Sequence, residues 1–297
     1  MTLQRILVTG ATGKQGGATV RALVRANGAS ATGPLFEVLA LTRNTESPAA
    51  QKLASLANVA LVKGDLDNPA AIFKTAGGNI HGVFSVQVAI GSGASAASEE
   101  RQGKALADAA ERAGVRHFVY TSVDFGELTG KTGIPHFDSK RRVEEHIRGK
   151  GNLPFTILRP VCFMDGFFDP SFSTVFATLV KTKIRPHVKL QLIDSPDIGE
   201  FAAIAFQRPE DWVGKTLSIA GDELTYAEIA RTFQEVTGRP PKTTLGLLAS
   251  GINLMVKELR TMFAFFDKHG YKADIARCRE IHPGLKTFRE CVESRTN

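Results

Sequence analysis

The chain has 297 residues, 43% hydrophobic and 23% charged, which is ordinary for a globular protein with a sizeable core. Its three cysteines are odd in number and lack metal-ligand spacing, so we expect reduced, buried thiols in the cytosol or nucleus and no metal site. The net charge of +7 would attract phosphate groups, but the absence of helix-turn-helix, zinc-finger and RNP patterns argues against direct nucleic-acid binding.

Two stretches bear on location. The first predicted strand begins at about Arg5, which leaves no room for a signal peptide. The longest apolar run, Leu245–Val256, contains Gly, Ser and Asn and is too short to cross a bilayer. We therefore expect no membrane partner and a cytoplasmic location, with the nucleus as an additional compartment.

Strand and helix patterns alternate through the first 160 residues. The predicted strands, several of them apolar runs typical of strands buried on both faces, are Arg5–Thr9, Glu37–Thr42, Ala60–Lys63, Gly82–Val86, His117–Ser122 and Phe155–Arg159. The predicted helices are Lys14–Ala26, Pro48–Leu56, Pro69–Thr75, Glu99–Ala113 and Ser139–Gly149. This alternation predicts an α/β fold of the Rossmann type, a doubly wound parallel sheet that binds its ligand at the carboxyl ends of the strands.

The pattern changes after Pro160. A strand at Thr216–Ile219 is expected to return to the sheet, and Asp222–Glu235 is predicted to be a helix. A stripe at helical spacing is more typical of core than of a ligand contact, and it consists of Leu259, Met262, Phe263 and Phe266.

These patterns predict two domains. Residues 1–160, with the returning strand near 216–219, form the Rossmann-type domain. Residues 161–186 and 222–297 form a smaller, mostly helical C-terminal lobe.

A glycine-rich turn, VTGATGKQGG at Val8–Gly17, joins the first predicted strand to the first predicted helix. Gly10 permits the tight turn, Gly13 lets the backbone approach phosphates, and Gly16 lets the helix lie close to the strand. A dinucleotide pyrophosphate binds at such a helix N-terminus through backbone N–H groups and the helix dipole. We predict a dinucleotide site that includes the other residues of the turn, Thr12, Lys14 and Gln15; the alternative is a turn that binds nothing.

The segment after the second predicted strand indicates which dinucleotide. NAD sites usually place an acidic residue there for the ribose hydroxyls, whereas this chain has Thr42-Arg43-Asn44. A guanidinium suits a ribose 2′-phosphate, and Lys14 adds a second positive charge. We therefore predict NADP(H), with Asp65 and Leu66 near the adenine. The alternatives are an ordinary surface side chain for Arg43 and a turn residue for Asp65.

A set of segments covering nearly the whole chain carries a family resemblance. They are the glycine turn, Arg43, Gly64–Leu66, Gln102–Asp108, Val119–Ser122, Pro135–Lys140, Val143–Glu145, Ile157–Pro160, Met262–Phe266, Gly270-Tyr271 and Pro283. Together they resemble the atypical short-chain dehydrogenases/reductases, and more closely the NmrA-like family with its HSCARG-type members. The resemblance implies a Rossmann fold and an NADP(H)-responsive regulator that acts through protein partners.

The resemblance also shows a departure from ordinary short-chain dehydrogenases. Those enzymes use Tyr-x-x-x-Lys, in which the tyrosine exchanges a proton with the substrate and the lysine holds the nicotinamide ribose. Here Lys140 stands at the lysine position, but His136 replaces the tyrosine. Ser122 or Thr121 lies where the family has a polar hydroxyl.

Three interpretations of this segment stay open. In the first, Lys140 only binds the cofactor ribose and His136 is structural. In the second, Lys140 is itself the general acid/base, as the similarity to the isoflavone-reductase branch implies, with Arg141 and Arg142 as nearby cations. In the third, His136 donates the proton, because an imidazole titrates near neutral pH.

Two functions follow from these interpretations, so whether the chain is an enzyme stays open. The first is a cofactor-responsive, redox-sensing regulator with weak or no dehydrogenase activity. The second is an NADPH-dependent reductase of a small aromatic, ketone or enone substrate that uses Lys140 as its acid/base. For either, residues 1–160 form the NADP(H)-binding domain, and the C-terminal lobe, which would bind the substrate or partner, covers the nicotinamide end of the cofactor. Ser122, Lys140 and Phe163 are expected to face this nicotinamide end. Phe163, Phe167 and Phe168 would form a pocket wall, with core packing as their alternative.

Overall fold

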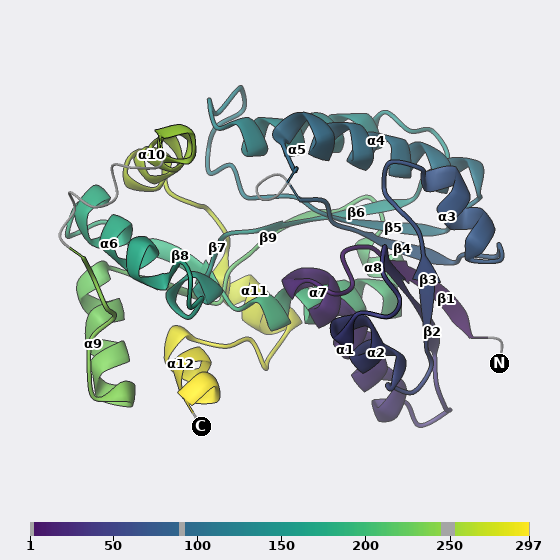
Figure 1. Cartoon of the computed structure of the whole chain (residues 1–297), viewed down its shortest axis with the longest axis horizontal. Helices are drawn as coiled ribbons and strands as arrows, with labels where there is room; N and C mark the ends of the chain where they lie inside the picture. The colour runs from purple at the N-terminus through teal and green to yellow at the C-terminus, as the bar shows by residue number, and fades with distance from the viewer. Residues whose placement is uncertain (1–2, 89–92, 245–252, 297) are drawn as a thin grey trace. The chain divides into compact units, whose positions relative to one another are not determined.

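The computed structural model (Figure 1) describes residues 3–88, 93–244 and 253–296. The chain divides into two compact units. Unit 1 comprises residues 1–122, 139–159 and 196–217, and unit 2 comprises residues 123–138, 160–195 and 218–297. Residues 123–138, which the sequence placed in the nucleotide domain, therefore group with unit 2.

Unit 1 is built on a seven-stranded sheet in the order β3-β2-β1-β4-β5-β6-β9. The strands are β1 (Gln4–Val8), β2 (Phe36–Thr42), β3 (Val59–Lys63), β4 (Gly82–Ser85), β5 (His117–Thr121), β6 (Phe155–Pro160) and β9 (Thr216–Ile219). Every pairing from β3 across to β6 is parallel. The strand order reverses between β1 and β4, the place where doubly wound sheets bind ligands. The predicted Rossmann-type sheet is confirmed.

Helices cover both faces of this sheet. Figure 1 shows α3 (Pro69–Thr75), α4 (Ala96–Arg112) and α5 (Pro135–Arg148) on one face, and α1 (Lys14–Ala29), α2 (Pro48–Ala54) and α7 (Ser195–Gln207) on the other. The short helix α8 (Pro209–Trp212) precedes β9. Because both faces are covered, the strands are apolar runs, and Ile6, Leu7 and Val8 are fully buried.

Two helices that position the site begin earlier than predicted. Helix α4 starts at Ala96 because Ser95 and Ser98 form a reciprocal capping box, a signal the sequence analysis missed. Helix α5 starts at Pro135, a proline at the first helical position with Asp138 in the first turn. Lys140 therefore lies in the second turn of α5 and not in the first.

Unit 2 is mostly helical around a three-stranded sheet in the order β10-β8-β7. Its elements are β7 (Cys162–Phe163), the 3-10 helix η1 (Met164–Phe167), α6 (Ser173–Lys183), β8 (Leu190–Ile193), β10 (Asp222–Leu224), α9 (Tyr226–Thr237), α10 (Asn253–Lys268), α11 (Ile275–Ile281) and α12 (Phe288–Thr296). The Phe176 ring makes edge-to-face contacts with the rings of Phe167 and Phe263, at centroid distances of 4.9 Å and 6.0 Å. In the predicted stripe Phe263 and Phe266 are buried, which supports the core interpretation for both.

The predicted helix over Asp222–Glu235 is wrong at its start. Asp222–Leu224 form β10, antiparallel to β8, and the helix begins only at Tyr226. Thr225 and Glu228 form a capping box, in which the Thr225 hydroxyl accepts from the Glu228 N–H and the Glu228 carboxylate accepts from the Thr225 N–H.

The three cysteines are buried free thiols, and burial raises the pKa of Cys162 to about 12. Within residues 3–88, 93–244 and 253–296, no helix is long and apolar enough to cross a bilayer. The apolar run Leu245–Val256 falls on residues 245–252, which lie outside the described residues, and on the first residues of α10.

Candidate dinucleotide-binding site

The glycine turn between β1 and α1 has the backbone geometry that its glycines require. Gly10 has φ +57°, a conformation that side-chain-bearing residues seldom adopt. A Cβ at Gly16 would lie only 2.2 Å from the Gly10 carbonyl oxygen and 2.5 Å from that of Thr9. Only glycine at position 16 therefore lets α1 pack this closely on the turn.

The first turn of α1 is open on its outer side. Gly13 is the N-cap residue and has no side chain to cap the helix, while Thr12, Gly13 and Lys14 are exposed. The backbone N–H groups of such a turn, with the helix dipole, are a ready anion-binding site. The Gln15 side chain ties α1 to the end of β5, because its Oε1 accepts a hydrogen bond from Thr121 Oγ1 at 2.6 Å, and its predicted contact with the cofactor stays a prediction.

The carboxyl ends of β2 and β3 carry the residues predicted for the adenine side. Arg43 and Asp65 are exposed and Leu66 is half-buried. Asp67, to which no sequence motif pointed, accepts hydrogen bonds through its carboxylate from Gln102 Nε2 at 2.9 Å and Arg101 Nη2 at 2.8 Å.

Arg43 belongs to this same charged group. The hydrogen bond from Gln102 is the main cause that lowers the pKa of the Asp67 carboxyl, followed by the hydrogen bond from Arg101, and the charge of Arg43 contributes to the same shift. The predicted adenine side therefore holds two guanidinium groups, those of Arg43 and Arg101, and two exposed carboxylates, those of Asp65 and Asp67.

A second polar cluster lies at the ends of β4 and β5, on the face that α4 and α5 cover. Lys140 Nζ donates to Glu99 Oε1 at 2.6 Å, and Ser139 Oγ donates to Glu99 Oε2 at 2.5 Å. Glu99 is fully buried, and the Lys140 side chain is 13% exposed. Lys140 is therefore not a surface residue, as the predicted site requires.

Buried polar atoms without partners accompany this cluster. Among the described residues, Ser122 Oγ, Tyr120 Oη and Gln87 Oε1 are buried and lack a hydrogen-bond partner. Ser85 of β4 and Tyr120 of β5 are partners in the parallel register. Gln87 and Ser122, each two residues further along the chain, therefore both lie at the carboxyl ends of these neighbouring strands. Burial, and then the charges of Glu99 and Glu144, raise the pKa of Tyr120 well above its ordinary value. Since buried polar groups are normally paired, these three unpaired atoms are candidates for hydrogen bonds to a ligand.

His136 and Phe163 are the predicted site residues that belong to unit 2. His136 Nδ1 lies 2.5 Å from Glu258 Oε1, and its ring contacts Phe137 edge-on. Phe163 is half-buried on β7, and its predicted contact with the nicotinamide stays a prediction. Phe167 is buried in the aromatic core of unit 2, which favours the core interpretation for that residue.

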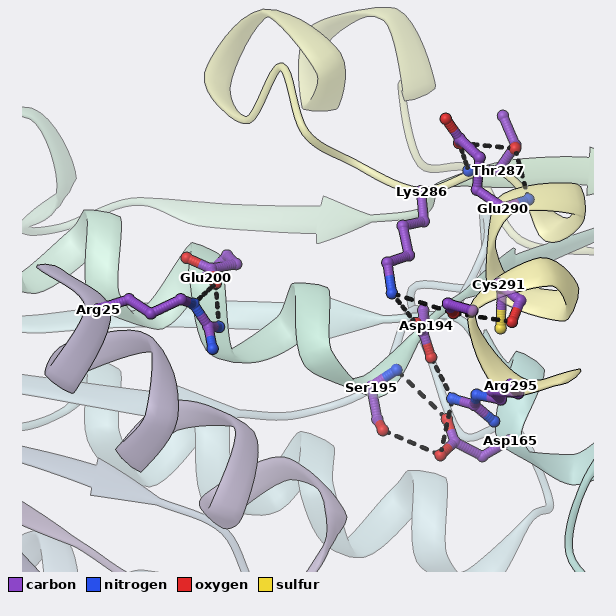
Figure 2. Close-up of polar contacts among 11 residues, drawn as sticks. Arg25, Asp165, Asp194, Ser195, Glu200, Lys286, Thr287, Glu290, Cys291 and Arg295 are labelled. Carbon is purple, nitrogen blue, oxygen red and sulfur yellow. Dashed lines mark hydrogen bonds and ion pairs between the residues drawn. The ribbon is translucent and has the colours of Figure 1, made fainter. Parts of the chain in front are cut away.

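Unit 2 has a charged cluster of its own (Figure 2). Arg295 of α12 donates to Asp194 and lies 3.3 Å from Asp165, while Lys286 Nζ lies 3.3 Å from Asp194. Ser195 Oγ donates to Asp165 at 3.0 Å. Each carboxylate therefore has a cation and at least one hydrogen-bond donor, which is the arrangement of a structural network.

A hollow of about 500 Å³ lies elsewhere in unit 1, lined by residues 150–155 and 213–214. It is at the amino end of β6, opposite the strand ends that carry the glycine turn and Lys140. We do not associate it with the dinucleotide site.

These features define an α/β protein of the Rossmann type with a glycine-turn ligand site. Residues 2–290 match the NmrA-like family. The NmrA-like family domain-containing oxidoreductase himF of Aspergillus japonicus is 28% identical over 257 residues, which cover 80% of this chain and 74% of that protein. The chain belongs to the NmrA-like family, as the sequence resemblance predicted.

Solved structures share this fold over nearly the whole chain. NmrA, a negative transcriptional regulator solved with NADP, has a TM-score of 0.73 at 21% identity, covering 99% of this chain and 95% of NmrA. Triphenylmethane reductase of Citrobacter sp., solved with NADP(H), has a TM-score of 0.75 at 21% identity, covering 98% of this chain and all of the reductase chain.

Proposed function

We propose that this chain binds NADP(H), with the pyrophosphate on the glycine turn and the first turn of α1. The observation that carries the proposal is the cradle at Gly16, where a Cβ would lie 2.2 Å from the Gly10 carbonyl oxygen. This close packing and the uncapped start of α1 are what a bound pyrophosphate needs. NmrA and triphenylmethane reductase, which share the fold, were both solved with this cofactor.

The preference for NADP(H) over NAD(H) rests on Arg43. It is exposed directly after β2, where an NAD site would place a carboxylate for the ribose diol. A guanidinium instead pairs with a 2′-phosphate through charge-assisted hydrogen bonds. Lys14 is exposed in the glycine turn and adds positive charge.

We further propose that the chain is a cofactor-responsive, redox-sensing regulator with weak or no dehydrogenase activity. Two side chains support this choice. His136, at the usual tyrosine position, is already engaged by Glu258, and Lys140 is paired with the buried Glu99. This arrangement suits a lysine that holds a ribose and a histidine that is structural. In this proposal a regulatory protein partner reads the cofactor state, in keeping with NmrA, which shares the fold and is a negative transcriptional regulator.

A reductase is the second candidate, and the Ser122 hydroxyl favours it. In the described part of the chain this buried hydroxyl has no partner, so it could bind a substrate oxygen. Lys140 would then act as general acid/base toward a small aromatic, ketone or enone substrate. Bound NADPH would supply the hydride. The oxidoreductase name of himF and the activity of triphenylmethane reductase agree with this second candidate.

A titration calorimetry experiment tests the cofactor proposal. Wild-type protein should bind NADPH at least about tenfold more tightly than NADH, and Arg43→Ala should remove most of that preference, because a charge-assisted pair is lost. Arg116→Ala, which removes a surface arginine at the amino end of β5, is the control and should leave both affinities unchanged. Equal binding of both cofactors by the wild type would contradict the preference.

An absorbance assay separates the two candidate functions. Incubation with NADPH and a panel of ketones, enones and quinones should give no turnover if the regulator proposal is correct. Turnover that Lys140→Arg abolishes, with NADPH still bound, would instead establish the reductase.

A further inference from the structure

The Glu99 carboxylate is the most completely buried charge at the candidate site. Its side chain has no exposed surface, and both of its oxygens are used, one by Ser139 and one by Lys140. Burying a carboxylate is costly unless charged and hydrogen-bonding partners compensate it. A residue whose only role was to hold α4 against α5 would not need a buried negative charge.

The two helices are already held together by other contacts. A Cβ at Gly103 of α4 would lie 2.9 Å from Val143 of α5, so the helices pack closely there. Glu100, the neighbour of Glu99, accepts hydrogen bonds from Arg142 and Lys104 at 2.6 Å each on the more exposed side of α4. Helix docking therefore does not explain why Glu99 is charged and buried.

What Glu99 controls is the place of the Lys140 ammonium. An ammonium has three N–H donors, and Glu99 takes one of them. The Glu99 oxygen that does not bind Lys140 is fixed by the buried Ser139 hydroxyl, so the carboxylate cannot turn freely. A long, flexible lysine side chain is thereby held in one position beside the ends of β4 and β5.

We propose that Glu99 is a positioning residue, which fixes the Lys140 ammonium so that its remaining N–H groups bind the vicinal hydroxyls of the nicotinamide-side ribose. The inference rests on the proposed NADP(H) binding and deepens it. It assigns the affinity for the nicotinamide half of the cofactor to a buried carboxylate that does not itself contact the ligand. The adenine half, bound at Arg43 and the glycine turn, does not depend on Glu99.

Two probes test this division. NADPH carries the nicotinamide ribose, whereas adenosine 2′,5′-bisphosphate carries the 2′-phosphate and the adenosine but no second ribose. Glu99→Gln keeps the size of the side chain and removes its charge. We expect it to weaken NADPH binding about tenfold and to change adenosine 2′,5′-bisphosphate binding less than about twofold, by calorimetry. Glu100→Gln, the matched control on the same helix, should change neither affinity.

A second variant keeps the test decisive if Glu99→Gln does not fold. Ser139→Ala removes one small hydroxyl and frees the carboxylate to turn, so it should weaken NADPH about threefold with the same selectivity. Equal weakening of both probes, or no weakening of NADPH, in a folded variant would overturn the inference. Failure of the wild type to bind either probe would overturn the proposed function itself, which is a distinguishable result.

Discussion

Two clusters of buried charge, one in each unit, differ in how completely their polar atoms are paired. In unit 2, Asp165 and Asp194 are surrounded by Arg295, Lys286 and Ser195 (Figure 2). In unit 1, Glu99 and Lys140 accompany Ser122 and Tyr120, buried residues whose hydroxyls have no partner in the described part of the chain. A completed network stabilises a fold, whereas an incomplete one has capacity for a ligand.

The largest expected effect comes from removing the cation of the unit 1 cluster. Lys140→Met leaves the Glu99 charge buried without its ion-pair partner and should lower the free energy of unfolding by about 3 kcal/mol. Adding Glu99→Gln to this variant removes the charge and should restore most of the loss in urea denaturation. A double variant as unstable as the single one would show that the charge of Glu99 is not the cause.

Removing Arg295 from the unit 2 cluster should have a smaller effect. Lys286 still pairs with Asp194 and Ser195 still donates to Asp165, so Arg295→Met should cost about 2 kcal/mol. The NADPH affinity of this variant should stay within about twofold of the wild type, whereas variants of the unit 1 cluster should bind NADPH more weakly. The control is Arg289→Met on the same helix, whose ion pair with Glu235 is half-exposed and should contribute less than about 0.5 kcal/mol.

His117 shows that a buried polar atom without a hydrogen-bond partner is not always a ligand contact, so the contrast between the two clusters does not extend to it. Thr156 Oγ1 donates to the Trp212 carbonyl, so it must accept from His117 Nε2, which leaves His117 Nδ1 as an unpartnered acceptor among the described residues. Burial, and then the charge of His81, lower the pKa of His117 to about 4. His117 is at the amino end of β5, away from the strand ends that carry the site.

This histidine predicts a pH dependence of stability. Below about pH 6.5 His117 binds a proton in the unfolded chain but stays neutral in the folded protein. The free energy of unfolding should therefore fall by up to about 2 kcal/mol as the pH drops towards 4.5. His117→Gln keeps a donor for Thr156 and cannot titrate. Its unfolding free energy, measured by urea denaturation across this range, should vary less with pH than that of the wild type. An identical slope for both proteins would exclude His117 as the source.

The sheet could be predicted well from the sequence because each of its strands is recognisable from its own local pattern of residues. Buried parallel strands are continuous apolar runs, and proline after Ser47 or Asn68 marks a helix start whose side-chain cap the structure shows. The helix predicted from Asp222 failed because pairing with β8, a strand some 30 residues away along the chain, overrides the local pattern.

The candidate site was predictable in its backbone but not in its side-chain partners. The glycine turn and Arg43 are local motifs, and both lie at the predicted strand ends. Glu99 is separated from Lys140 by 41 residues and was read only as part of a helix. No local pattern shows that a glutamate is buried, since that depends on how α4 and α5 pack.

Titration of NADPH into Gly16→Ala tests the central claim most directly, with Gly28→Ala as the control on the same helix. A Cβ at Gly28 meets no atom within 4 Å, so that variant should bind like the wild type. At Gly16 the added Cβ would collide with the Gly10 carbonyl, so the turn must open and NADPH affinity should fall by more than about tenfold. Wild-type affinity in a folded Gly16→Ala protein would contradict the claim that this turn holds the cofactor.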